Sequence, residues 1–434
     1  MRQNLAASLA ENISATNKAS EINVREFYRL PWTMADNAMT WLEPTRFCNL
    51  KCDACFHFSD PLSHKSLKEI RFEMEQLMQL RKCDAMLIAG GEPLTHPKIL
   101  DIIKIVKSFK VKPVLMTNGV GIDEQMIREF KKAGLSGITF HVDSHQKRPG
   151  WEGKTESELN ELREHYATML KKIKGVTCAF NTTIFPDTLE QVPEIVKWAL
   201  ENIDKVHILS LIAVRMINSV DPIDYYIGSR KIDLEETPYN SKIKYRNIMS
   251  EEIYHQIKKV IPAYRFNSFL GGTTRSDAPK WLLSTHAGIK DRSFGNLGPR
   301  SMELLQTFNH LFTGKYLGFN KSSLNKLGKE TLSFAIFDNY VRQLFSNYLS
   351  FILKHPLYLF RPLYLQAITV VQPVDILPTG ENDNCDGCPN KTLWQGRLIS
   401  ACRLEEYLIY GSPIQTIPKS IYEAVPEELL IPEK

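Results

Sequence analysis

The sequence predicts an α/β fold whose first half is a parallel sheet covered by helices. From about residue 39 to residue 214, short apolar runs alternate with amphipathic stretches. These make six successive strand–helix units of about 30 residues each. Strands that alternate with helices are joined by right-handed crossovers and therefore lie parallel. The pattern fits a partial barrel or an open doubly wound sheet, and in both folds ligands bind at the carboxyl ends of the strands.

The elements of this first half follow from the period of their apolar residues. Six runs are expected to be strands: 39–48, 85–90, 113–117, 138–142, 177–184 and 206–214. Five stretches between them are expected to be helices: 67–82, 99–109, 123–133, 156–174 and 189–203. Asp123 is predicted to cap the third helix and Gly134 to end it.

Composition places the chain among globular proteins. Of 434 residues, 43% are apolar and 24% are charged, which excludes a disordered or collagen-like chain. The longest uncharged apolar stretch, 343–353, is shorter than the roughly 18 residues that span a bilayer. Residues 1–20 lack the apolar core of a secretory signal. We therefore expect a cytoplasmic protein, with association to a membrane surface as a further option.

The eight cysteines are too few for a disulfide scaffold in a chain of this length. Six of them fall into two groups of three: Cys48, Cys52 and Cys55, and Cys385, Cys388 and Cys402. Such groups indicate metal or iron–sulfur ligands in a reducing compartment. A structural zinc site normally has four protein ligands, so three thiolates indicate an open fourth position.

Three short motifs follow the first three predicted strands. They are CNLKCDAC at 48–55, AGGEP at 89–93 and MTNG at 116–119. Together they resemble the signature of the radical S-adenosylmethionine (radical SAM) superfamily, and the resemblance covers roughly residues 39–215. The alternative is a zinc-binding α/β protein. The residue before the third cysteine, usually aromatic in that superfamily, is Ala54 here.

The resemblance implies a partial (β/α)6 TIM-type barrel that uses a [4Fe–4S] cluster and S-adenosylmethionine. Cys48, Cys52 and Cys55 would hold the cluster, whose open iron would bind S-adenosylmethionine. Gly90 and Gly91, which lack a Cβ, would let the backbone approach the methionine moiety.

Further contacts to S-adenosylmethionine are also implied by the resemblance. The backbone beside Glu92, with its side chain, would receive the ammonium group. Asn118, Asp143 and Asn181 would contact ribose, carboxylate or substrate, although Asp143 could equally be a strand-end cap. His57 is expected to be an ordinary loop histidine, and no catalytic residue is assigned.

The activity implied by the resemblance is reductive cleavage of S-adenosylmethionine to a 5′-deoxyadenosyl radical, which abstracts hydrogen from a substrate. A low-potential donor such as flavodoxin or ferredoxin would supply the electron. A non-catalytic iron–sulfur binding protein is the alternative, against which the intact glycine–glycine–glutamate motif argues.

The second cysteine group resembles the short C-terminal cluster-binding extensions of several radical SAM enzymes. It predicts an auxiliary iron–sulfur cluster at Cys385, Cys388 and Cys402, or alternatively a small zinc site. Candidates for a fourth ligand are Cys83, Cys178, Asp383, Asp386 and an external group. Cys83 and Cys178 are expected to be buried structural thiols, since each begins or lies in a predicted strand.

The middle of the chain is basic and aromatic, whereas the tail from residue 403 is acidic. Residues 241–370 carry 18 Lys and Arg against 7 Asp and Glu, together with 20 of the 43 aromatic side chains. Predicted helices at 251–260 and 333–353, a loop at 271–300 and a short strand at 367–374 make this a mainly helical segment. The composition indicates an anionic or partly apolar partner, or simply a solvated basic face.

Three substrate classes fit the middle segment. A hydrophobic or lipid-like metabolite with an anionic head would use aromatic walls and basic clamps, and residues 333–364 could contact a membrane surface. A peptide would need a groove or sheet edge, as in a peptide maturase. A small polar metabolite is the third class, and nucleic acid is disfavoured because no compact basic run supports it.

The domain division expected from the sequence has four parts. They are an N-terminal extension at 1–38, a radical SAM partial barrel at 39–215, a basic specificity segment at 216–374 and a cluster-binding region with its tail at 375–434.

Overall fold

The computed structural model describes residues 22–215, 223–233, 246–318, 324–377 and 381–418. The predicted N-terminal extension is therefore described only from residue 22, and the acidic tail only to residue 418. The other residues of both lie outside the described part of the chain. Among the described helices, none combines the length and apolar character that crossing a bilayer requires.

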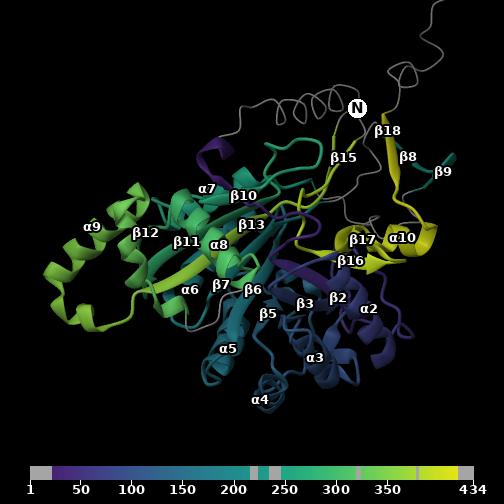
Figure 1. Cartoon of the computed structure of the whole chain (residues 1–434), viewed down its shortest axis with the longest axis horizontal. Coiled ribbons are helices and arrows are strands. Elements are labelled where there is room, and N and C mark those ends of the chain that lie inside the picture. Colours follow the sequence, from purple (N-terminus) through teal and green to yellow (C-terminus); the bar gives the residue numbers. More distant parts are fainter. Residues whose placement is uncertain (1–21, 216–222, 234–245, 319–323, 378–380, 419–434) are drawn as a thin grey trace, which may run out of the picture.

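The fold is built on one sheet of eleven strands (Figure 1). Nine neighbour pairs run in the order β1-β10-β11-β13-β7-β6-β5-β4-β3-β2, and β12 pairs with β11. The first half comprises six consecutive parallel strands: β2 (Met39–Thr45), β3 (Ala85–Gly90), β4 (Lys112–Thr117), β5 (Gly137–His141), β6 (Thr177–Ile184) and β7 (Ile208–Ala213). The predicted α/β class with a partial TIM-type barrel is confirmed.

Five helices connect these strands, and the first four of them lie along the lower border of the molecule in Figure 1. They are α2 (Leu67–Leu80), α3 (Ile99–Ser108), α4 (Glu124–Ala133), α5 (Asn160–Lys171) and α6 (Val192–Glu201). Local signals fix their ends. Ser66 and Glu69 form a capping box on α2, Asp123 caps α4, and Gly134 ends α4 in the left-handed conformation, as predicted for that helix.

The middle of the chain extends the same sheet. β13 (Tyr364–Val371) adds parallel to β7, and β11 (Trp281–Ile289) pairs antiparallel with β13. β10 (Ser268–Leu270), β12 (Arg292–Asn296) and β1 (Tyr28–Arg29) complete that side. The predicted loop at 271–300 is therefore correct for residues 271–280 and wrong beyond them. The Ser, Thr and Gly residues of β11 and β12 occupy strands, because packing between neighbouring strands outweighs their weak strand preference.

The remaining elements come from the middle segment and from the C-terminal region. The middle segment contributes β8 (Ile223–Ile227), β9 (Arg230–Ile232), α7 (Ser250–Val260), α8 (Pro299–Thr313) and α9 (Asn339–Lys354). The C-terminal region contributes β14 (Asp375–Ile376), β15 (Asn382–Asp383), β16 (Lys391–Trp394), β17 (Arg397–Ser400), α10 (Leu404–Tyr410) and β18 (Gln415–Pro418). Short 3-10 turns are η1 (Val24–Glu26), η2 (Pro93–Thr95), η3 (Ser144–Gln146), η4 (Leu189–Gln191), η6 (Leu324–Lys326), η7 (Glu330–Ile336), η8 (Pro356–Phe360) and η9 (Ala401–Arg403).

Each face of the sheet has its own packing. The largest apolar core lies between the strands and the flanking helices. A smaller core on the other face joins small strand residues such as Ala85 and Ala89 to Trp41, and Ala401 from the C-terminal region packs into it. The C-terminal cysteine region is thereby held against the first strands of the barrel.

Candidate functional site

The loop after β2 carries Cys48, Cys52 and Cys55 and is attached to the end of β3. The Gly91 N–H donates to the Thr45 carbonyl oxygen (3.0 Å), and the Glu92 N–H donates to that of Phe47 (2.7 Å). The first predicted motif therefore lies directly beside the second, as expected for neighbouring parallel strands.

Gly90 and Gly91 are required by this close backbone contact. Gly90 has φ +108°, and a Cβ there would fall 2.5 Å from the Thr45 carbonyl oxygen. A Cβ on Gly91 would fall 2.5 Å from the Arg46 carbonyl oxygen and still closer to that of Phe47. The structure thus gives these glycines a role in docking the cysteine loop, and their approach to a methionine moiety stays a prediction.

Glu92 joins the ends of β3 and β4. Its carboxylate is 1% exposed and accepts from the Thr117 hydroxyl (2.7 Å), the Asn118 N–H (2.7 Å) and the Leu94 N–H (2.9 Å). Burial raises the pKa of Glu92, and the three donors oppose that rise. The carboxylate therefore fixes the end of β4 against the turn that follows β3. Its contact with an ammonium group remains a prediction.

Asn118 links β4 to the cysteine loop. Its Nδ2 donates to Asn49 Oδ1 (2.7 Å), and its side chain also hydrogen-bonds Cys48. Arg148 donates from Nη2 to the Asn118 carbonyl oxygen (2.7 Å) and so fixes the backbone that follows β4. Asn49 and Arg148 carry no motif signal, and sequence reasoning did not single them out.

Asp53, between the second and third cysteines, attaches the loop to the turn after β5. Its N–H donates to the His145 carbonyl oxygen (2.9 Å), and its carboxylate pairs with Lys147 (2.5 Å) and the His145 ring (3.3 Å). The cysteine loop is therefore fixed at the ends of three strands.

Asp143 caps the turn after β5, as one of its two predicted roles required. Its carboxylate accepts from the His145 N–H (3.0 Å) and lies 2.9 Å from His141 Nε2. Burial acts to raise the pKa of Asp143, but the hydrogen bond and charge of His141 and the N–H groups of Thr183 and His145 lower it overall. His141, half-exposed on β5, was not predicted as a site residue.

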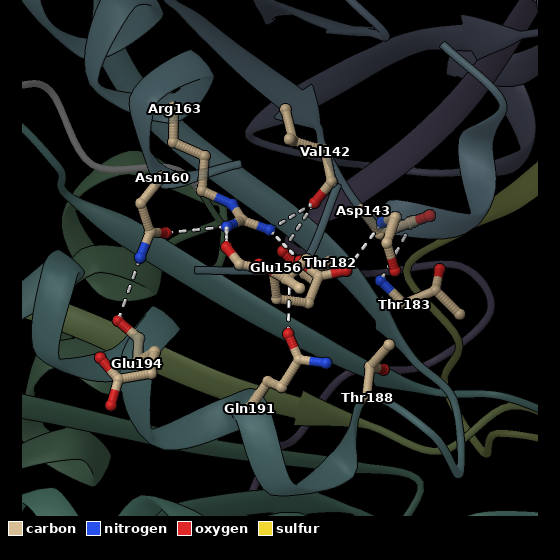
Figure 2. A network of polar contacts seen from close by, with 12 residues as sticks. Val142, Asp143, Glu156, Asn160, Arg163, Thr182, Thr183, Thr188, Gln191 and Glu194 are labelled. Atoms are coloured by element: carbon tan, nitrogen blue, oxygen red, sulfur yellow. Dashed lines mark hydrogen bonds and ion pairs between the residues drawn. The ribbon is translucent and has the colours of Figure 1, made fainter. Parts of the chain in front are cut away.

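A buried ion pair beneath Asp143 holds its turn in place (Figure 2). Arg163 on α5 pairs with Glu156, and both side chains are fully buried. Arg163 also donates to the Val142 carbonyl oxygen (3.0 Å), while Glu156 accepts from the Ser144 N–H (2.7 Å). The residues on both sides of Asp143 are thus fixed by one pair of opposite charges.

The three sulfurs are close enough to influence each other's ionisation. Burial raises the pKa of Cys52, and the charges of Asp143, Cys55 and Cys48 raise it further. Thiolates are the form that binds iron, so a bound cationic centre would offset the burial and charge repulsion that favour the protonated thiols. Ala54 adopts φ +56°, a left-handed turn that leads the chain into Cys55.

The donor set fits a [4Fe–4S] cluster. Among the described residues, no three His, Cys, Asp or Glu side chains are arranged to hold a single metal ion. A cluster places a different demand on the protein, because each thiolate binds its own iron. Three thiolates on one loop meet that demand and leave one iron free.

Comparison with known proteins identifies the domain that this site occupies. Residues 42–199 match the model of the radical SAM superfamily. The chain therefore contains a radical SAM domain. Radical SAM proteins are enzymes that use a [4Fe–4S] cluster and S-adenosylmethionine for radical reactions, which agrees with the predicted cofactors.

Individual relatives of this radical SAM chain are distant. It is 23% identical over 300 residues to a tungsten-containing aldehyde ferredoxin oxidoreductase cofactor-modifying protein of Pyrococcus furiosus, covering 60% of this chain and 78% of that one. It is 25% identical over 177 residues to an AdoMet-dependent heme synthase of Methanosarcina barkeri, covering 39% of this chain and 48% of that one. The structure of Streptococcus suis SuiB bound to the precursor peptide SuiA overlaps 42% of this chain and 40% of that one, with 20% identity and a TM-score of 0.34.

His57 is the main correction within the radical SAM domain. It is not an ordinary loop histidine, because its ring lies between two buried carboxylates, 3.4 Å from Glu405 and 3.8 Å from Glu43. Arg46 reaches the same Glu405 at 3.5 Å. Since Glu405 belongs to α10, the C-terminal region directly contacts the loop of the first cysteine group.

The second cysteine group is also assembled by the fold. Gly387, between Cys385 and Cys388, has φ +63°, and a Cβ there would collide with the Trp32 carbonyl oxygen. The Asn37 side chain donates to the Gly387 carbonyl oxygen (2.9 Å) and holds the turn. A hydrogen bond from Cys385 lowers the pKa of Cys388 to about 6, and burial with the Cys388 charge raises that of Cys402 to about 12.

Arg81 lies against this second group. Its Nη2 donates to the Cys388 carbonyl oxygen (2.7 Å), and the side chain is 1% exposed. Nε and Nη1 of Arg81 find no hydrogen-bond partner among the described residues, and burial lowers the Arg81 pKa to about 10. An anionic metal–thiolate centre that includes Cys388 would offset the buried positive charge of Arg81.

The candidates for a fourth ligand lie in different environments. Cys83 and Cys178 are buried at 1% exposure, as predicted. Asp383 is committed to the Thr274 N–H (2.8 Å) and to Lys280 (3.3 Å). Asp386 pairs with Arg29 at 2.7 Å, so neither aspartate offers a free carboxylate. Both aspartates are therefore engaged in ion pairs, and the identity of a fourth ligand stays open.

Asn181 lies within a strand, whereas Glu92, Asn118 and Asp143 each follow one. It occupies β6, pairs in register with His141 and places Nδ2 4.0 Å from the Met116 sulfur. On the neighbouring β7, half-exposed residues alternate with buried ones, so one face of the sheet is open there. This open face is where a substrate could approach the strand ends.

Proposed function

We propose that this chain reductively cleaves S-adenosylmethionine and uses the resulting 5′-deoxyadenosyl radical to abstract hydrogen from a substrate. The observation that carries the proposal is the attachment of the three-cysteine loop to the ends of β3, β4 and β5. Cys48, Cys52 and Cys55 would hold a [4Fe–4S] cluster there. A low-potential protein such as flavodoxin or ferredoxin would supply the electron.

In this proposal the surrounding residues orient S-adenosylmethionine. Gly90, Gly91 and Glu92 would bind the methionine moiety, and Asn118 and Asp143, at the ends of β4 and β5, would contact the ribose or the carboxylate. Asn181, on β6, would contact the substrate. These assignments agree with the short contacts that fix each residue.

The enzyme is distinguished from a non-catalytic iron–sulfur protein by its product. Dithionite and S-adenosylmethionine, added under anaerobic conditions to cluster-loaded protein, should yield 5′-deoxyadenosine. The Cys52→Ala variant should yield none. A fully loaded wild-type protein that forms no 5′-deoxyadenosine would favour the binding-protein alternative.

We further propose that Cys385, Cys388 and Cys402 hold a second iron–sulfur cluster, with a small zinc site as the alternative. Two observations support this proposal. The Cys388 and Cys402 charges raise the pKa of Cys385, so the three thiols lie close together, and the positive charge of Arg81 is buried beside Cys388. Iron and sulfide analysis of anaerobically purified protein separates the two options. About eight irons per chain would support a second cubane cluster, whereas about four irons with one zinc would refute it.

For the substrate we propose a hydrophobic or lipid-like metabolite with an anionic head. The open face of the sheet combines apolar side chains such as Trp281 and Leu283 with the hydroxyl pair of Ser210 and Thr369 (2.9 Å). Such a mixed lining suits a largely apolar ligand with a few polar groups.

A peptide substrate is the second candidate, as in a peptide maturase, and it would bind in a groove or along an exposed sheet edge. Organic extraction of the purified protein, followed by mass spectrometry, tests the choice. A bound lipid would support the first proposal, and a protein free of lipid that binds no amphiphile would leave the peptide.

A further inference from the structure

An apolar surface on the middle segment has no part in the site described above. Helix α9 packs one side against β12 and η7, with Val341, Leu344, Tyr348 and Ile352 buried at helical spacing. In Figure 1 this helix lies at the end of the molecule opposite the β16–β17 hairpin. The contacts of α9 with the rest of the fold are therefore made by one side of the helix.

A second side of α9 is also apolar, and it is exposed. Phe345, Leu349 and Leu353 follow one another at four-residue intervals and are 41%, 45% and 77% exposed. In η8, which follows directly, Leu357 is 77% and Phe360 is 85% exposed. We call these five residues the α9–η8 surface. Single exposed apolar residues are ordinary, but a continuous row of this kind marks an interaction site.

The charges around the α9–η8 surface are mostly positive. Between residues 326 and 361 the basic residues are Lys326, Lys329, Arg342, Lys354 and Arg361, and the acidic ones are Glu330 and Asp338. Asp338 is buried, where it accepts from the backbone N–H groups of Ser301 (3.0 Å) and Tyr340 (2.9 Å). Only Glu330 is left to oppose five cations. At 100° per residue, Arg342 projects from the same side of α9 as Leu349.

We propose that the α9–η8 surface docks this protein onto an anionic phospholipid bilayer. A helix that lies in the membrane interface inserts its apolar side among the acyl chains and places Lys and Arg at the headgroups. Anionic headgroups attract each basic residue near the surface. The geometry and the charge of the α9–η8 surface meet both requirements at once.

Other partners fit less well. A second copy of this chain docking through the same surface would place Arg342, Lys354 and Arg361 of the two copies together, which opposes self-association. A nucleic acid would match the basic residues but would leave the leucines without an apolar partner. The docking surface is also independent of the proposed radical chemistry, so the two proposals have separate readouts.

Vesicle flotation with the full-length protein tests the proposal. The protein should float with vesicles of phosphatidylcholine and phosphatidylglycerol, should float weakly with phosphatidylcholine alone, and should be released by high salt. Replacing Lys354 or Arg361 by Ala should weaken binding about fivefold each.

A variant that places negative charge within the α9–η8 surface tests the proposal most directly. Leu353→Glu/Leu357→Glu should weaken binding by at least about tenfold for each leucine removed from the bilayer. Both positions are highly exposed, so the thermal unfolding temperature and 5′-deoxyadenosine formation should match wild type. Phe72→Glu, at a position on α2 that is 60% exposed, is the matched control and should bind like wild type.

Three results would overturn the proposal. They are equal binding to neutral and anionic vesicles, absence of binding to either, and full binding by Leu353→Glu/Leu357→Glu. A dimer in light scattering that the same double variant converts to a monomer would instead assign the surface to self-association.

Discussion

Removing one charge of the buried pair of Arg163 and Glu156 should destabilise the fold more than removing both charges together. Arg163 donates to the Val142 carbonyl oxygen (3.0 Å) and Asn160 Oδ1 (2.8 Å) besides its ion pair with Glu156. Replacing Arg163 by Met leaves a fully buried carboxylate with the Ser144 N–H as its remaining described donor. Breaking a buried pair in this way costs about 3–5 kcal/mol of the free energy of unfolding.

The double variant Arg163→Met/Glu156→Gln removes both charges and should recover about 2 kcal/mol or more of that loss. The free energy of unfolding is measured by urea titration followed by circular dichroism, with an unchanged dependence on urea concentration as the check on compactness. Lys154→Met breaks an exposed pair with Glu158 nearby and should leave stability unchanged. Strictly additive losses in the double variant would refute the reasoning.

Three further variants test single contacts in the two cysteine sites. Gly91→Ala should lower the iron content by about four per chain, because a Cβ there displaces the loop that begins at Cys48. The second site should keep its metal, and an unchanged iron content would contradict this prediction. Arg81→Gln should lower the reduction potential of the second centre, because a nearby positive charge favours the reduced state, and a redox titration that shows no shift would disprove the contact's electrostatic role. Cys178→Ala should keep iron and 5′-deoxyadenosine formation and cost about 1 kcal/mol of stability, whereas loss of iron would make Cys178 a ligand.

Periodicity and local chemistry were sufficient for the first half of the chain. The six parallel strands and the cap at Asp123 follow from residues that are neighbours in sequence. The gathering of the cysteine loop, Glu92 and Asn118 also follows, because the carboxyl ends of adjacent parallel strands meet at one edge. The second cysteine group could be recognised from the short spacing of its residues in the sequence. Its position beside the barrel could not be predicted, because it depends on contacts between distant segments.

What the sequence did not reveal depends on contacts between distant segments. His57 meets Glu405 across almost the whole length of the chain, and neither residue belongs to a periodic pattern or motif. β11 was missed because its Ser, Thr and Gly residues signal turns when read locally, whereas pairing with β13 makes them a strand. Arg81 gave no signal either, since its burial depends on the C-terminal region.

The electron paramagnetic resonance spectrum of the dithionite-reduced protein, with and without S-adenosylmethionine, tests the central claim most directly. We expect a [4Fe–4S] signal that changes when S-adenosylmethionine is added and that is absent from the Cys52→Ala variant. A signal from the second centre should remain in that variant. A signal sensitive to S-adenosylmethionine that survives in Cys52→Ala would contradict the assignment of the site to the loop of Cys48, Cys52 and Cys55.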